Sequence, residues 1–199
     1  MAEKLNKNRI RDTRLIAIVA ILVFLFTEPR APHWLHEFSE FLGFMLVIVC
    51  VLGRLYATTF IGGVKNHKLM TDGPFAMVRN PLYFFSLVGV AGVGLMSTRI
   101  TVALALLGIF YIIFDRMITR EEKFLKEKFG KDYKAYCAAT PRLWPDFKKY
   151  TAPDVIEVRP QYVLNAVKDC TFWFLPYFVF ELIDWLHATG NLPVLVLLP

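Results

Sequence analysis

Long apolar runs separated by charged segments limit what this chain can fold into. The chain has 199 residues and is 56% hydrophobic, yet 20% of its residues are charged. Its mean hydropathy is +0.45, so the apolar and charged residues must be segregated, as in membrane spans joined by charged loops. Four or five spans of about 20 residues each leave little chain for a soluble module. The sequence therefore predicts an all-α, polytopic membrane helical bundle that forms one domain over residues 1–199.

The first two spans are predicted from single apolar runs. Residues 15–26 are short enough to be the core of a signal peptide. No small-residue cleavage site follows them, so we expect a retained span. The second span is expected at about residues 38–61.

The later spans are predicted as a hairpin and an additional segment. Residues 82–97 and 100–118 are separated only by a turn at Thr98 and Arg99, which predicts two antiparallel helices. Residues 163–186, within an additional region at 160–199, are apolar and aromatic but include Pro176. This last segment fits either a fifth span or a helix lying in the membrane interface, and the sequence leaves both open.

Lysine and arginine are distributed unevenly between the two sides of these spans. They precede the first span, lie between the second and third, and follow the fourth, whereas the opposite side has only Arg30 and Arg99. The excess marks the cytoplasmic side, which would hold the amino terminus, the 62–81 loop and the 119–160 region. The orientation of the spans in the membrane thus accounts for the excess of basic residues and the formal charge of +6. Nucleic acid is not an expected partner, because no single basic stripe is interleaved with aromatic residues.

Metal and disulfide chemistry are not expected. Cys50, Cys137 and Cys170 are widely spaced, odd in number and without a C-x-x-C pair, so we expect reduced cysteines. His33 and His36 stand three residues apart without further ligands nearby in the sequence, so no metal site is predicted.

The 62–81 loop ends in a turn and a helix start. Gly73 and Pro74 indicate the turn, and Pro81 suits the first turn of the third span. Arg79 would lie at the membrane boundary beside the amino terminus of that helix, where an anionic group is favoured. The alternative is an arginine that only extends its charged end toward water.

Glycines at positions 89, 92 and 94 recur within the third span. Such spacing usually allows another helix to approach closely. The functional alternative is a flat ligand packed against a helix face that lacks side chains.

Two adjacent carboxylates follow the fourth span. If one helix continues through them, Glu121 lies at the centre of an apolar stripe and Glu122 at its edge; the stripe contains Met117, Ile118, Phe124, Leu125 and Phe129. A carboxylate buried there without a partner costs several kcal/mol. The partner is either an arginine at position 54, 79 or 142, or a cationic ligand.

A second ion pair is expected at the same boundary. Arg54 and Asp115 would both lie where the spans meet the cytoplasmic side. We predict that they form a buried structural pair.

An ordered set of these motifs over residues 71–147 resembles a known family. It comprises Gly73-Pro74-Phe75, Val78-Arg79-Asn80-Pro81-Leu82-Tyr83, the glycines of the third span, Glu121-Glu122 with Leu125, Phe129-Gly130, Tyr133, Tyr136, Pro141-Arg142 and Pro145. In order and spacing the chain resembles the isoprenylcysteine carboxyl methyltransferases and the related phospholipid methyltransferases.

This resemblance implies a helical-bundle enzyme with a cytoplasmic-side pocket for S-adenosylmethionine, open sideways to the membrane for a lipophilic substrate. It implies that Glu121 and Arg142 act in catalysis, with Arg142 near the substrate or a closing loop. The residues that it assigns to the cofactor are Arg79, Asn80, Pro81, Tyr83, Gly92, Gly94, Glu121 and Glu122. The family usually has histidine where this chain has Asn80, and asparagine cannot titrate near neutral pH. A proton-transfer role at position 80 is therefore in doubt, whereas a role in holding the cofactor is kept.

The expected activity is methyl transfer to an acceptor dissolved in the membrane. The resemblance is greatest to carboxyl methylation of an isoprenylcysteine; a phospholipid amine or a small lipophilic thiol or acid is the alternative. S-adenosylmethionine is a sulfonium cation with an amino-acid end, and carboxylates, aromatic faces and an anion-binding group suit it.

Two further functions fit the sequence: a nicotinamide-dependent enzyme like the sterol reductases, which share a similar carboxy-terminal pattern, and a non-enzymatic membrane scaffold. The sequence leaves the oligomeric state open.

Overall fold

The structure, a computed structural model, describes residues 25–29, 32–62 and 68–198. The first predicted span, residues 15–26, lies almost entirely outside these residues and stays a prediction. The helices are α2 (His33–Ile61), α3 (Pro74–Met77), α4 (Pro81–Met96), α5 (Ile100–Ala139), α6 (Pro160–Thr171) and α7 (Leu175–Ala188). Two 3-10 turns, η1 (Phe147–Lys149) and η2 (Phe172–Phe174), and two short strands, β1 (Thr27–Pro29) and β2 (Val196–Leu198), complete the described elements.

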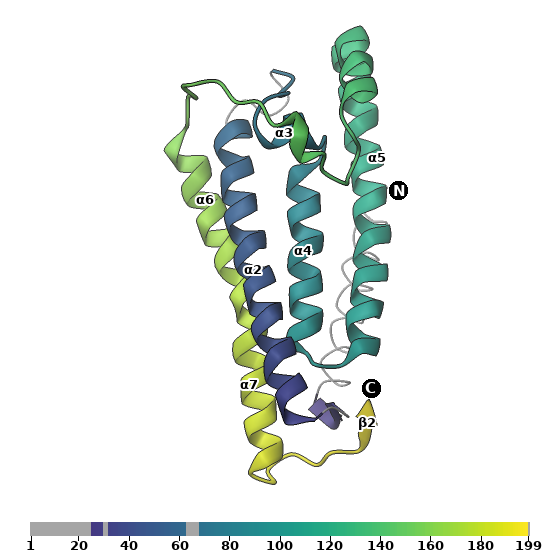
Figure 1. Cartoon of the computed structure of the whole chain (residues 1–199), viewed down its shortest axis with the longest axis vertical. Helices are drawn as coiled ribbons and strands as arrows, with labels where there is room; N and C mark the ends of the chain where they lie inside the picture. The colour runs from purple at the N-terminus through teal and green to yellow at the C-terminus, as the bar shows by residue number, and fades with distance from the viewer. Residues whose placement is uncertain (1–24, 30–31, 63–67, 199) are drawn as a thin grey trace, which may run out of the picture.

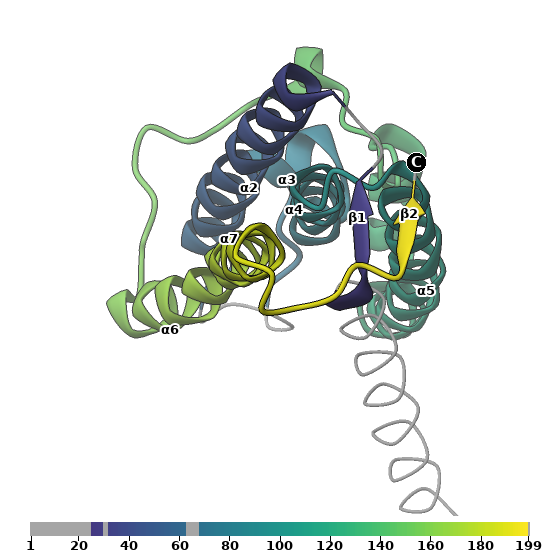
Figure 2. The ribbon, with the colours of Figure 1, turned by 90° about the horizontal axis from the view of Figure 1, so that it is seen from below.

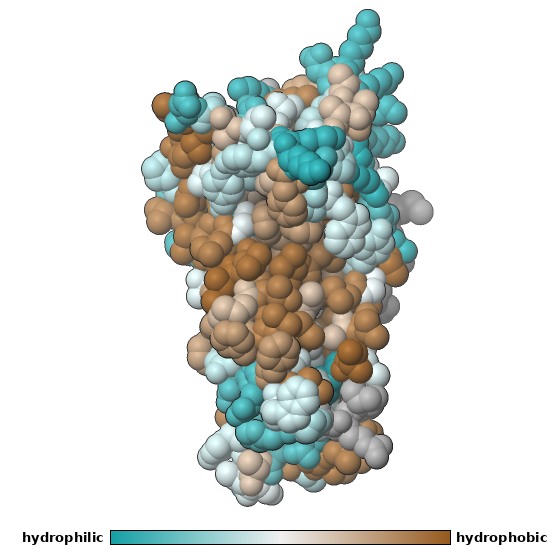
Figure 3. All heavy atoms as spheres, viewed as in Figure 1, coloured by the Kyte–Doolittle hydropathy of each residue, from teal (hydrophilic) through white to brown (hydrophobic). Residues whose placement is uncertain are grey.

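The long helices form an elongated bundle. Helices α2, α4 and α5 lie side by side, and α6 and α7 follow one another along α2 (Figure 1). Helices α2 and α5 are long and apolar enough to cross a membrane, and α4 is a shorter apolar helix. Apolar side chains form a belt around the middle of the visible face, with polar residues gathered at both ends (Figure 3). A bilayer would cover such a belt, so the predicted helical membrane bundle is supported.

The helices pack closely around α4. Val47 of α2, Met96 of α4 and Ile183 of α7 form a buried cluster. Gly43 of α2 and Gly92 of α4 face each other so closely that a Cβ on Gly92 would lie 2.6 Å from the Gly43 carbonyl oxygen. The helix-packing interpretation of the glycine run is therefore confirmed for this pair.

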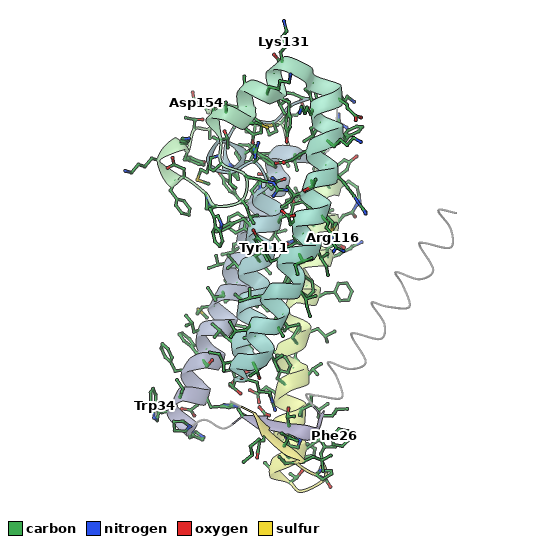
Figure 4. The ribbon with its side chains drawn as sticks, turned by 90° about the vertical axis from the view of Figure 1, so that its right-hand side faces the viewer. Phe26, Trp34, Tyr111, Arg116, Lys131 and Asp154 are labelled. Carbon is green, nitrogen blue, oxygen red and sulfur yellow. The ribbon has the colours of Figure 1, made fainter. Side chains whose placement is uncertain are left out.

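The predicted hairpin is confirmed, but its second helix is longer than expected. Helix α5 follows α4 after the turn at Ser97–Arg99 and runs well beyond residue 118, to Ala139. Glycine often ends a helix, so the sequence alone predicts a stop at Gly130. In the structure Gly130 bends the helix instead, with φ 53° and ψ −112°, a conformation that glycine adopts without a Cβ penalty. Figure 4 shows the result: the helix extends past Arg116 to a tip near Lys131, where it turns back over the bundle.

The 163–186 segment forms two helices in line. Helix α6 has 12 residues and α7 has 14, joined by η2. Pro176 lies in the first turn of α7, where its missing N–H costs no helical hydrogen bond. The segment packs against the bundle through α2 and α4.

A small feature was not predicted at the opposite end from the α5 tip. Strands β1 and β2 pair in parallel, with Thr27 opposite Val196 (Figure 2). Arg99 holds β1: its Nε donates to Thr27 Oγ1 at 3.0 Å, and its remaining nitrogens donate to the carbonyl oxygens of Ser97 and Thr27. The fold is therefore mostly helical, as predicted, but it also contains this pair of short strands.

Candidate active site

A cavity of about 350 Å³ lies where α4 begins, at the end of the bundle that carries the α5 extension. The end of α2, the 68–70 loop, the start of α4 and the extended part of α5 surround it. Its lining residues are Ile61, Lys68, Leu69, Met70, Phe75, Arg79, Asn80, Pro81, Leu82, Tyr83, Arg120, Glu121, Phe124, Leu125, Tyr133 and Tyr136. The wall is thus mostly apolar, with a few charged groups that converge on one space.

A tight turn shapes the floor of this cavity. Gly73 has φ 59°, and a Cβ there would lie 2.4 Å from the Phe60 ring, so the position requires glycine. Pro74 then begins α3, and Pro81 begins α4 directly after Asn80. The predicted turn and helix start are confirmed, and they bring residues 79–83 to the cavity.

The chain after α5 forms a strap across this floor. Three backbone hydrogen bonds fix it: Arg79 N to Pro141 O at 2.9 Å, Asp146 N to Met77 O at 3.0 Å, and Gly73 N to Thr151 O at 2.6 Å. The Pro141–Pro145 segment, which carries Arg142, is therefore fixed to the turn that carries Arg79.

Glu122 is the hub of a charged network behind the cavity wall. Its Oε1 lies 3.4 Å from a terminal nitrogen of Arg79 and accepts a hydrogen bond from Asn80 Nδ2 at 3.3 Å. Its Oε2 accepts from Arg142 Nε at 3.2 Å. Burial alone would lower the pKa of Arg142, but its hydrogen bond to Asp115 and the charge of Glu122 raise that pKa. The network therefore keeps Arg142 charged.

The two adjacent glutamates have different environments. Glu122 pairs with Arg79 and Arg142 and is not among the residues that line the cavity, so the arginine partners considered for the central carboxylate, Glu121, belong to its neighbour. Glu121 lines the cavity with Arg120, and it interacts with the Tyr83 hydroxyl. Of the predicted apolar stripe, Ile118 is buried, whereas Met117 and Phe124 are exposed.

The predicted pair between Arg54 and Asp115 is wrong. Asp115 instead pairs with Arg142, which the strap brings beside α5. Arg54 donates to Ser86 Oγ and, at 3.4 Å, to the Leu82 carbonyl oxygen. The partner of Asp115 thus comes from the strap after α5. The path of this strap could not be predicted from the positions of the helices in the sequence.

Two tyrosines beyond the Gly130 bend cover the cavity. Tyr133 and Tyr136 are buried, and Tyr136 donates its hydroxyl to the Phe75 carbonyl oxygen at 2.6 Å. Burial is the main cause that raises the pKa of each above its ordinary range, so both phenols stay neutral at physiological pH. Tyrosine is common at membrane interfaces, so the sequence alone favours an anchoring role for them. The structure adds a place in the cavity wall.

The structure gathers most of the predicted site residues. Arg79, Asn80, Pro81, Tyr83 and Glu121 line the cavity. Glu122 and Arg142 lie in the adjoining network. Gly92 and Gly94 lie further along α4 at helix contacts, Gly94 against Ala103 of α5.

Sequence reasoning did not assign Lys68, Phe75 or Arg120 to the site. The two cations were used only to orient the spans, although Arg120 precedes Glu121 directly and Lys68 belongs to the loop that ends in the motif. Among residues 25–29, 32–62 and 68–198, no three His, Cys, Asp or Glu side chains are grouped to hold a metal ion. Cys50, Cys137 and Cys170 are free thiols.

Comparisons with known proteins identify a family that this chain resembles. Residues 34–132 match the family model described as phospholipid methyltransferase. The chain is 29% identical to the cobalt-zinc-cadmium resistance protein CzcN of Cupriavidus metallidurans, over 98% of this chain and 90% of that protein. It is 27% identical to the nickel-cobalt-cadmium resistance protein NccN of Alcaligenes xylosoxydans xylosoxydans, over 98% of this chain and 92% of that protein.

A third similarity covers the motif region alone. Protein-S-isoprenylcysteine O-methyltransferase B of Arabidopsis thaliana is 31% identical over 77 residues, which is 39% of each chain. No solved structure matches the chain significantly. The match over residues 34–132 and this local similarity agree with the ordered motifs around the cavity, and they confirm the predicted resemblance of the chain to the phospholipid methyltransferase family.

Proposed function

We propose that the cavity binds S-adenosylmethionine and that the protein transfers the cofactor's methyl group to an acceptor dissolved in the membrane. One observation carries this proposal: residues 79–83 and Glu121, from segments far apart in the sequence, converge on one cavity of about 350 Å³. That volume falls in the range of about 300–1,000 Å³ typical of small-molecule sites.

The lining residues suit the parts of this cofactor. The Glu121 carboxylate would hold a cationic part, either the sulfonium or the amino group. Arg79, beside the amino terminus of the 16-residue helix α4, would hold the carboxylate end. The cofactor supplies the reactive methyl group. The protein residues orient the acceptor in a water-poor site, where proximity provides most of the rate enhancement.

The charges at the cavity favour an anionic acceptor. Lys68 and Arg120 line it in addition to Arg79, against the single lining carboxylate of Glu121. An ammonium group would be repelled by these cations, whereas a carboxylate would be attracted. Asn80 cannot act as a general base, and a carboxylate acceptor needs none. Leu69, Met70 and Phe124 would contact the apolar part of the acceptor.

Arg142 has a supporting place in this proposal. Its guanidinium is held by Asp115, Thr119 and Glu122, and its carbonyl oxygen accepts from Asn80. These contacts fit a residue that holds the strap against the site and sets the position of Asn80.

We place the cavity on the cytoplasmic side, because the predicted loops on that side carry most of the Lys and Arg. Lys131 and Trp34 lie at opposite ends of the bundle and are exposed (Figure 4). Single cysteines at these two positions, in a chain whose native cysteines are replaced by alanine, test the orientation in sealed vesicles. We expect an impermeant maleimide to reach position 131 only from the cytoplasmic side and position 34 only from the other. The reverse pattern would overturn the placement.

The function is tested with purified protein in detergent. Calorimetric titration with S-adenosylmethionine should show saturable binding, and titration with NADPH under the same conditions should show none. Incubation with methyl-labelled cofactor and three acceptors (a prenylated cysteine carboxylate, phosphatidylethanolamine and a lipophilic thiol) should label the carboxylate as a base-labile ester. Absence of binding at millimolar cofactor would remove the methyltransferase proposal, and labelling of the amine alone would remove the anionic acceptor.

A second role is suggested by the two relatives that match over nearly the whole chain, both named for metal resistance. We propose that this chain contributes to tolerance of cobalt and cadmium through the same methyl-transfer site. A sensitive host that lacks the gene would be complemented with the wild type or with Glu121→Gln. Loss of tolerance with the variant, at equal expression, is expected. Equal tolerance would show that any such role is independent of the cavity.

A further inference from the structure

The hydrogen bonds of Asn80 fix the direction of its amide. An asparagine side chain has two N–H donors and one oxygen acceptor. Here Nδ2 donates to Glu122 Oε1 at 3.3 Å and to the Arg142 carbonyl oxygen at 2.9 Å. A flipped amide would place its oxygen against a carboxylate and a carbonyl, which repel it, so the network itself determines the orientation.

The oxygen of Asn80 is consequently the atom available to a ligand. Among the described residues it accepts no hydrogen bond, yet it is not one of the fully buried atoms without a partner. Asn80 as a whole is only 9% exposed and lines the cavity. Because Nδ2 is committed to Glu122 and Arg142, Oδ1 is the side-chain atom of Asn80 that remains for a ligand in this cavity, as an acceptor with no donor function.

Glu122 acts through its neighbours. It holds Asn80 and Arg79 with one oxygen and Arg142 with the other, and it does not itself line the cavity. Removing its negative charge would free the Asn80 amide to rotate and would weaken the position of the Arg79 guanidinium. The adjacent Glu121 has the opposite arrangement, because it lines the cavity directly.

We propose that Glu122 is a positioning residue that makes Asn80 present a hydrogen-bond acceptor to the cofactor, which then donates an N–H to Asn80 Oδ1. This inference rests on the proposed function and specifies it. S-adenosylmethionine offers such donors in its amino group and its adenine amine. Asn80, at the position where the family usually has histidine, thus serves as a hydrogen-bond acceptor whose orientation is fixed by the Glu122 carboxylate.

The test exchanges the hydrogen-bond donor and acceptor roles of Asn80 and Glu122. Asn80→Asp would place a carboxylate against Glu122 and should weaken S-adenosylmethionine binding about tenfold or more, since buried like charges repel. Glu122→Gln should weaken binding about three- to tenfold, less than the loss of a charge-assisted hydrogen bond made directly to the cofactor, because Glu122 acts on the cofactor only through its neighbours. In the double variant Asn80→Asp with Glu122→Gln, the amide at position 122 can donate a hydrogen bond to the carboxylate at position 80. The total charge of the two side chains is the same as in the wild type. It should bind more tightly than Asn80→Asp alone.

The measurements are calorimetric affinity for S-adenosylmethionine and thermal unfolding of each variant in the same detergent. Glu127→Gln, on an exposed position of α5, is the matched control and should match the wild type in both. A purely structural role would lower stability and would give no recovery of affinity in the double variant, which overturns the inference. If folded Asn80→Asp and Glu122→Gln both bind like the wild type, the positioning role is also excluded. Failure of the wild type to bind would instead reject the proposed function, so the two failures are distinguishable.

Discussion

The two ends of the bundle each contain a buried arginine, and their hydrogen bonding differs. Arg99 is 2% exposed and donates through Nε and both terminal nitrogens to Thr27 and Ser97. Arg79 is also mostly buried, but its contact to Glu122 is 3.4 Å long, and its buried Nε has no hydrogen-bond partner among the described residues. Native structures satisfy nearly all buried donors, so an exception needs an explanation. The difference fits the proposal that Arg79 holds the cofactor, whereas Arg99 completes the fold.

The largest effect is expected at Arg99. Replacement by alanine leaves the carbonyl oxygens of Thr27 and Ser97 without their charged donor and should lower the free energy of unfolding by about 3 kcal/mol. Thermal and chemical unfolding in detergent would measure this loss. Arg116→Ala, at an exposed position of α5, is the control and should change stability by less than about 0.5 kcal/mol. A marked loss of cofactor affinity in folded Arg99→Ala would contradict the assignment of folding to the Arg99 end and of cofactor binding to the Arg79 end.

The next effect concerns Glu121 at the cavity end. Glu121→Gln keeps the volume but removes the charge, and should reduce S-adenosylmethionine affinity ten- to a hundredfold, or about 1.5–3 kcal/mol. The unfolding temperature should stay close to that of the wild type, since Gln can keep one hydrogen bond. Calorimetry and thermal unfolding on the same samples decide the outcome. Unchanged binding in a folded variant would remove Glu121 from the site.

A conservative change at Arg79 sharpens the comparison further. Arg79→Lys keeps the positive charge but loses the planar fork of donors, and should weaken cofactor binding about tenfold, or about 1.4 kcal/mol. Stability should change less than in Arg99→Ala. If the order is reversed, with stability lost and affinity kept, Arg79 is a structural residue like Arg99.

The smallest effect is expected at Gly92, between the two ends. A Cβ there would lie 2.6 Å from the Gly43 backbone, so Gly92→Ala should force α2 and α4 apart and cost about 1 kcal/mol. Gly108→Ala, whose added Cβ would meet no other part of the described chain within 4 Å, is the control. Cofactor affinity should be unchanged in both variants. A loss of affinity without a loss of stability would place Gly92 in the cofactor site after all.

The sequence predicted those parts of the fold that depend on local patterns. The α4–α5 hairpin followed from two apolar runs around Thr98 and Arg99, and the start of α4 followed from Pro81. The course of α5 beyond Gly130 could not be predicted, because glycine both ends helices and permits a bend with φ 53° inside one. Strands β1 and β2 have three residues each and show no periodicity to detect.

The site was predictable to the extent that its residues lie in one ordered motif. Arg79, Asn80, Pro81 and Tyr83 are adjacent in sequence, so placing one of them places the others. The choice of partners was not predictable, because it depends on the strap. Arg142 reaches Asp115 and Glu122 only because residues 141–151 fold back across the 73–79 turn. The environments of Glu121 and Glu122, one residue apart, are therefore set by tertiary structure.

The pairing of β1 with β2 has a consequence for the order of assembly. It ties residues near Thr27 to residues near Val196 and so closes almost the whole described chain into a ring. Closing so large a loop in an unfolded chain would cost about 4–5 kcal/mol of entropy, more than two three-residue strands return. If the spans first insert and pack, the helices themselves hold these segments near one another and most of that cost disappears. We therefore expect the strand pair and its Arg99 contacts to form last, as the closing step of biogenesis after the membrane helices are in place.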